Sequence, residues 1–89
     1  MNRFEDQTTE QIYNTRFAPD VPDHVSVEAH EQMRILAAAH TLQDVSVLGP
    51  ILRWQSQPDR YGLHVHGKWH VTFVWSNSIG ATAIKLERR

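Results

Sequence analysis

The sequence contains no cysteine, so disulfide bonds and thiolate metal sites are excluded. It also lacks an apolar run long enough to cross a bilayer, and it does not open with a basic segment followed by an apolar one. We therefore expect a cytoplasmic protein with no membrane partner. Internal repeats are absent too, and a chain of 89 residues has room for one modest core. The expectation is a single domain over residues 1–89.

The chain has almost no net charge, but its charge is unevenly distributed. Residues 1–50 carry 3 basic and 8 acidic side chains, a balance of −5, whereas residues 51–89 carry 6 basic and 2 acidic ones, a balance of +4. The two halves add up to the net charge of −1. This asymmetry allows a local basic face, although a stand-alone nucleic-acid-binding domain is usually more basic.

The clearest pattern is the alternation of apolar and polar side chains over residues 61–75. Alternation at period two predicts strands, and Gly67 marks the turn of a hairpin. A three-residue loop over 66–68 places Val65 opposite Trp69 and keeps the apolar side chains of both strands on one face. A slip by one residue would bury the polar side chains instead, so this register is predicted.

The same register has a consequence for the other face of the hairpin. His64 is then directly opposite His70 on the face that points away from the core. The hairpin therefore combines a hydrophobic side with a side that bears two imidazoles.

Two helices are predicted before the hairpin. The first covers residues 8–15, where Thr8 and Gln11 form a capping-box pattern. The second covers residues 26–39, whose apolar side chains recur at helical spacing and form one stripe: Ala29, Met33, Leu36 and Ala37.

Two further strands are predicted at residues 51–52 and 79–86, one before and one after the hairpin. Because the helices come first and the strands follow consecutively, the pattern indicates an α+β protein. We expect two N-terminal helices packed on a twisted antiparallel sheet of three to four strands.

Two stretches, residues 33–45 (MRILAAAHTLQDV) and 63–73 (LHVHGKWHVTF), resemble the RelE/HigB superfamily of bacterial toxins, specifically its plasmid-killer branch. The first is similar to a helix of that branch and the second to its hairpin. They occur in the family's order and near its spacing. The resemblance implies the same fold, with two N-terminal helices against a twisted antiparallel sheet.

The resemblance also implies a function. Such toxins belong to toxin–antitoxin pairs, cleave messenger RNA at the ribosome, inhibit translation, and are neutralised by a cognate antitoxin, here expected to be of the helix-turn-helix type. They are endoribonucleases that use no metal or other cofactor. Arginine, lysine and histidine on an exposed sheet face activate the ribose 2′-hydroxyl, bind the scissile phosphate and protonate the leaving oxygen.

The candidate site follows from that comparison. His70 is the expected acid or base, and His64 is its partner or a phosphate contact. The full catalytic set is His64, His70, Arg60 and Arg89. The residues expected to contact RNA or a protein partner are Arg53, Trp54, Lys68, Lys85 and Arg88.

Other interpretations of these residues stay open. The family's hairpin arginines correspond to His64 and His70, and its C-terminal Asp-Tyr-His ending is absent. A second hypothesis is therefore a catalytically inactive RelE-fold module that binds a larger protein complex, such as an inhibitor encoded by a phage or mobile element. Both histidines can also be ordinary half-exposed sheet residues. A zinc site formed by His64, His66 and His70 is the weakest alternative, because no carboxylate adjoins them in the sequence.

Overall fold

The computed structural model describes residues 3–54, 57 and 59–88. Its helices are α1 (Gln7–Thr15), α2 (Asp23–Ala38) and the one-turn α3 (Leu42–Val45), which continues into a 3-10 turn, η1 (Ser46–Leu48). The strands are β1 (Leu52–Arg53), β2 (Arg60–His64), β3 (Trp69–Ser76) and β4 (Gly80–Arg88), and they form one antiparallel sheet in sequence order. The predicted α+β class is thereby confirmed.

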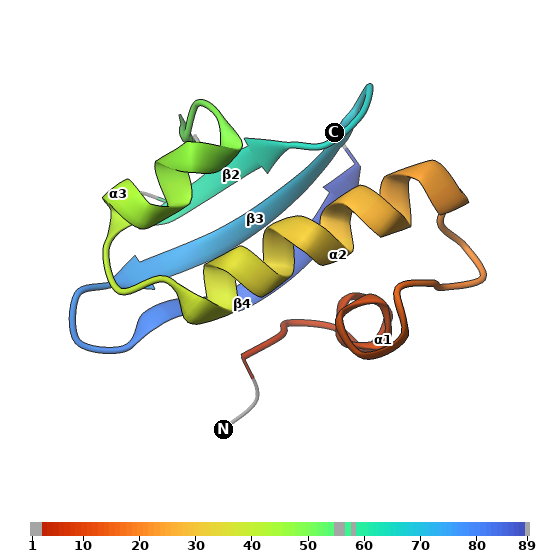
Figure 1. Ribbon diagram of the computed structural model, residues 1–89, viewed down its shortest axis with the longest axis horizontal. Coiled ribbons are helices and arrows are strands. Elements are labelled where there is room, and N and C mark those ends of the chain that lie inside the picture. The colour runs from red at the N-terminus through yellow and green to blue at the C-terminus, as the bar shows by residue number, and fades with distance from the viewer. Residues whose placement is uncertain (1–2, 55–56, 58, 89) are drawn as a thin grey trace.

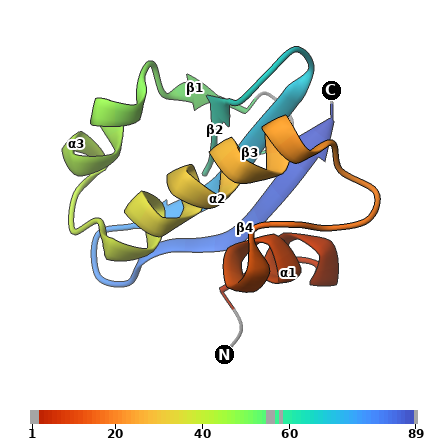
Figure 2. The same cartoon turned by 45° about the vertical axis from the view of Figure 1, so that its right-hand side comes forward.

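The helices and the sheet form two layers. Helix α2 lies across one face of the sheet and α1 lies beside β4 (Figure 1), while α3 and β1 lie on the side of the molecule away from α1 (Figure 2). The core between the layers contains the α2 stripe and the inward side chains of the strands, including Ala29, Met33, Leu36, Leu63, Val71, Phe73 and Ile84. No helix in the described part of the chain has the length and apolarity that a membrane span requires.

Helix α1 begins earlier than the sequence indicates. Its N-cap is Asp6, whose carboxylate accepts a hydrogen bond from the Thr9 N–H at 2.8 Å. The capping box predicted at Thr8 is therefore wrong, because a carboxylate two residues upstream satisfies the free amide. Helix α2 begins at Asp23, three residues before the predicted start, and the carbonyl of its N-cap residue Pro22 accepts from the N–H groups of Val25 and Ser26 at 3.0 Å.

The one-turn helix α3 has a capping box that was not predicted. Thr41 accepts a hydrogen bond from the Asp44 N–H, and the Asp44 carboxylate accepts from the N–H groups of His40 and Thr41 at 3.0 and 3.2 Å. These backbone hydrogen bonds stabilise the ionised form and lower the pKa of Asp44 below its ordinary 3.8. The cap directs the fully buried Val45 into the core.

The hairpin adopts the predicted register. Tyr61 pairs with Phe73, Leu63 with Val71 and His64 with His70. The Val65 N–H donates to the Trp69 carbonyl at 3.0 Å, which closes the predicted three-residue loop.

The pairing of β3 with β4 contains a bulge at Ala83. Val74 is opposite Thr82, but Thr72 is opposite Lys85, so two residues of β4 stand against one of β3. The φ of Ala83 is 50°, which lies in the left-handed region that residues other than glycine rarely adopt.

The bulge reverses the side-chain direction in the second half of β4. Because successive side chains alternate between faces, one additional residue turns the rest of the strand over. Ile84 and Leu86 are therefore buried in the core, and Lys85 and Glu87 lie on the opposite face.

A short N-terminal segment covers the outer edge of β4. Phe4 forms a parallel bridge with Ile84, the Glu5 N–H donates to the Ile84 carbonyl at 2.9 Å, and the Ile84 N–H donates to the Arg3 carbonyl at 2.8 Å. This contact leaves the Glu5 side chain beside the sheet, where it joins the candidate site.

Candidate functional site

The face of the sheet opposite α2, which we call the open face, carries the polar side chains that the hairpin register predicts. Residues that pair directly across antiparallel strands share a face. One row across this face runs from His64 through His70 to Glu87, and the next runs from Gly62 through Thr72 to Lys85. Three strands therefore place two imidazoles, one carboxylate, one hydroxyl and one ammonium on the same surface.

The two imidazoles are neighbours held by the hairpin turn. Their ring centroids are 5.3 Å apart in an edge-to-face arrangement. His64 Nε2 lies 2.9 Å from the Gly67 carbonyl oxygen, and His70 Nδ1 lies 3.1 Å from the Lys68 carbonyl oxygen. A carbonyl only accepts, so each of these nitrogens carries a proton. In the neutral rings the proton acceptors are then Nδ1 of His64 and Nε2 of His70.

The two histidines differ in exposure. His64 is exposed, whereas His70 is only 8% exposed. The ring of Trp54 lies 5.5 Å from the His70 ring in an edge-to-face contact and packs on Gly62, so it covers His70 on the open face. Both histidines lie on the face that points away from the core, as predicted, but only His64 is open to solvent there.

Arg60 is buried in a hydrogen-bond network next to this row. Its side chain donates to Thr72 Oγ1 at 2.9 and 3.0 Å, to Glu5 Oε2 at 2.9 Å and to the Ala83 carbonyl at 2.8 Å. Thr72 in turn donates to the Glu87 carboxylate, which lies 3.7 Å from Arg60 Nε. Two carboxylates therefore offset the guanidinium charge, and the geometry commits Arg60 to holding the strands together.

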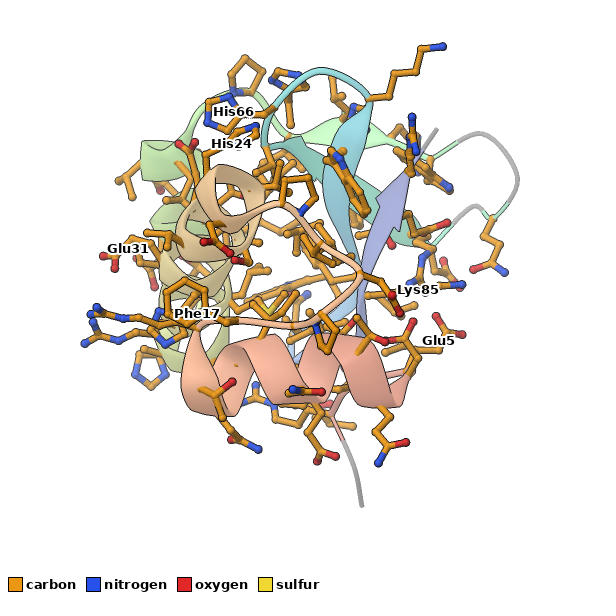
Figure 3. The ribbon with its side chains drawn as sticks, turned by 90° about the vertical axis from the view of Figure 1, so that its right-hand side faces the viewer. Glu5, Phe17, His24, Glu31, His66 and Lys85 are labelled. Carbon is orange, nitrogen blue, oxygen red and sulfur yellow. The ribbon has the colours of Figure 1, made fainter. Side chains whose placement is uncertain are left out.

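A small polar cavity of about 120 Å³ opens beside the network. Its lining comprises Glu5, Trp54, Gln57, Arg60, Lys85 and Glu87. Figure 3 shows Glu5 and Lys85 on the same side of the molecule. Lys85 makes no ion pair with the residues that the structure describes. Its ammonium is therefore free of any ion pair to the described residues and is available to an anionic group.

The remaining predicted cations are not assembled at this row. Lys68 is exposed in the hairpin turn. Arg53 pairs with Tyr61, whose side chain points to the helix side of the sheet. Arg88 pairs with Trp69 on that same side, and its guanidinium lies 5.9 Å from the indole centroid. Arg89 lies outside the described residues.

Two acidic residues of the site were missed in the sequence. Glu87 lies opposite His70, and Glu5 reaches Arg60 from the N-terminal segment. If side chains simply alternated along the last strand after the predicted turn at 76–78, Glu87 would point to the core. The extra residue of the bulge at Ala83 shifts this alternation and places Glu87 on the open face.

The three-histidine metal arrangement is not formed. His66 lies in the turn and its Nε2 contacts Glu28 Oε2 on α2 at 2.7 Å, with the His24 ring 5.3 Å away. Figure 3 shows His24 and His66 together at one end of the molecule. Within residues 3–54, 57 and 59–88, no group of three or more metal-ligating side chains is arranged to hold an ion.

Comparison with known proteins adds no identification to this geometry. No protein-family model matches the chain. A search of curated protein sequences also finds no match.

Proposed function

We propose that the chain is a RelE/HigB-type toxin: a metal-independent endoribonuclease that acts on messenger RNA at the ribosome in the cytoplasm and is neutralised by a cognate antitoxin. The α+β fold and the resemblance of residues 33–45 and 63–73 support this assignment. The observation that carries it is the His64–His70 pair, in which a carbonyl of the hairpin turn holds each ring at a different nitrogen.

Such a pair suits cleavage of an RNA strand. One neutral imidazole accepts the proton of a ribose 2′-hydroxyl, whose oxygen attacks the adjacent phosphorus, and a protonated imidazole donates to the departing 5′ oxygen. The products are a 2′,3′-cyclic phosphate and a free 5′-hydroxyl, and no metal is required.

Two neighbours supply binding interactions. Lys85 can neutralise a phosphate without first breaking an ion pair to a described residue, and the Trp54 ring offers a surface on which a base can stack. Because Trp54 covers His70, we expect RNA to stack on the indole or displace it before His70 reacts.

Growth and cleavage assays test the proposal. Expression of the wild type in a bacterial host should arrest growth, and co-expression of the neighbouring open reading frame should relieve the arrest. His64→Ala and His70→Ala should each reduce ribosome-dependent cleavage by about 100-fold to 10,000-fold. His40→Ala, which changes another exposed histidine, is the control and should retain activity. Full toxicity of His70→Ala with an intact fold would contradict the assignment.

A second candidate is the catalytically inactive RelE-fold module that binds a larger protein complex. The specific observation in its favour is Arg60, which is 4% exposed and carries two carboxylates within ion-pair distance. A guanidinium in this state does not offer its charge to a phosphate. Unimpaired growth on expression, no cleavage by purified protein, and stable binding to a protein assembly would favour this candidate over the nuclease.

A further inference from the structure

One stripe of α2 contacts the tip of the hairpin at three successive turns of the helix. His24 lies 5.3 Å, ring to ring, from His66, and Glu28 Oε2 lies 2.7 Å from His66 Nε2. Gln32 Nε2 donates to the His64 carbonyl at 3.0 Å. Residues spaced by four lie on the same side of a helix, so these contacts form one continuous seam between α2 and the turn.

The turn held by this seam supplies both carbonyl groups that orient the candidate imidazoles. Gly67 accepts from His64 and Lys68 accepts from His70. His66 immediately precedes these two residues, so its contact with Glu28 fixes the start of the loop. Movement of the loop would release both rings together.

Gln32 holds the strand that leads into this loop. Its side chain is almost fully buried, and its Oε1 has no hydrogen-bond partner within the described residues. A buried acceptor without a partner is unfavourable. The Gln32 side chain is nevertheless oriented so that Nε2 donates to the His64 carbonyl. This carbonyl is at the end of β2, beyond the two residues that pair with β1, so Gln32 supplies the hydrogen bond there.

We propose that Glu28 and Gln32 are positioning residues for the His64–His70 pair. They act through the hairpin turn and touch neither imidazole ring. The catalytic consequence of this role rests on the proposed nuclease function, whereas the orientation of the rings does not. A misplacement of about 1 Å is enough to reduce the rate of a positioned reaction by roughly 100-fold.

Nitrogen-15 NMR of the imidazole rings tests the positioning role directly. In the wild type with neutral rings, His64 should be protonated at Nε2 and His70 at Nδ1. Glu28→Ala and Gln32→Ala should each lose this fixed pattern, so that both rings show mixed tautomers. Glu28→Gln retains an acceptor of the same length and should preserve the pattern. Unchanged tautomers in both alanine variants, with the fold intact by circular dichroism, would overturn the proposal.

Glu31→Ala is the matched control. Glu31 is on the same helix, is exposed, and contacts Arg34 at 3.8 Å, away from the hairpin. Its removal should leave both tautomers unchanged.

Cleavage assays then separate this proposal from the function on which it builds. Glu28→Ala should lower kcat while KM changes little, because the substrate-binding residues are untouched. If the wild type cleaves no RNA, the nuclease assignment fails, and the NMR comparison alone still decides whether Glu28 and Gln32 orient the rings.

Discussion

The indole of Trp54 packs directly on the backbone of Gly62. A β-carbon added at Gly62 would lie 2.9 Å from two ring carbons of Trp54, closer than side chains approach in folded proteins. The absence of a side chain at this strand position therefore allows the indole to approach the strand closely and to cover His70.

We predict that Gly62→Ala displaces Trp54 while the strand stays paired, because the ring can rotate and the backbone cannot. His70 should become more exposed, and unfolding should require about 1 kcal/mol less free energy than in the wild type. Acrylamide quenching of Trp54, measured with Trp69 and Trp75 both replaced by phenylalanine, should increase. Unchanged quenching would show that the ring is held elsewhere.

We predict that Ala83→Gly stabilises the protein by about 0.5–1 kcal/mol, because glycine adopts the left-handed conformation at this bulge without strain. Urea unfolding measures the change. Ala81→Gly, in the same strand but before the bulge and fully buried, should destabilise by about 1 kcal/mol. Destabilisation by both substitutions would mean that the bulge is not strained.

We predict that Arg60→Leu destabilises the protein by about 1–2 kcal/mol, because it removes the hydrogen bonds to Thr72 and Ala83 and leaves the partly exposed Glu5 and Glu87 without their shared cation. Chemical denaturation of the purified variant is the measurement. Combining Arg60→Leu with Glu5→Gln and Glu87→Gln should recover part of the loss. A stable Arg60→Leu variant that has lost activity would instead indicate a direct role for Arg60 in RNA binding.

We predict a pH-dependent stability that originates at His30. Burial, followed by the nearby charges of Arg16 and Arg34, lowers the pKa of His30 below its ordinary 6.5. The folded state then binds this proton more weakly than the unfolded chain does. The contribution that His30 makes to the free energy of unfolding is therefore fully present above pH 6.5. It is lost as the pH falls from 6.5 through the lower pKa of His30 in the folded state.

The measurement compares the free energy of unfolding of the wild type and His30→Gln between pH 8 and pH 5. The wild type should lose more stability over this range than the variant does. Identical slopes would show that neither burial nor the neighbouring arginines lower the pKa of His30.

The sequence was sufficient to predict the hairpin because two independent signals agreed there. The alternation over residues 61–75 required one face to be apolar, and only a three-residue loop after Val65 satisfied it. The buried stripe of α2 was predictable for a similar reason, since Ala29, Met33 and Leu36 recur at helical spacing.

The composition of the open face was not predictable to the same extent. The bulge at Ala83 has no glycine to signal it, so the placement of Lys85 and Glu87 depends on a local strain that packing of Ile84 compensates. Likewise, the burial of Arg60 depends on Glu5, which is distant in sequence and reaches the sheet only after the N-terminal segment pairs with β4. Contacts of this kind leave no periodic trace in a sequence.

The bridge between the N-terminal segment and β4 also determines the order in which the molecule can be completed. Arg3 donates through its Nε to the Ala81 carbonyl, a contact that spans 78 positions of the chain. During synthesis the first residues have no strand to join until β4 has left the ribosomal tunnel, and closing so long a loop slows folding. Glu5 can therefore join Arg60 only once β4 is in place for the N-terminal segment to pair with, so the open face is unfinished until that pairing has formed.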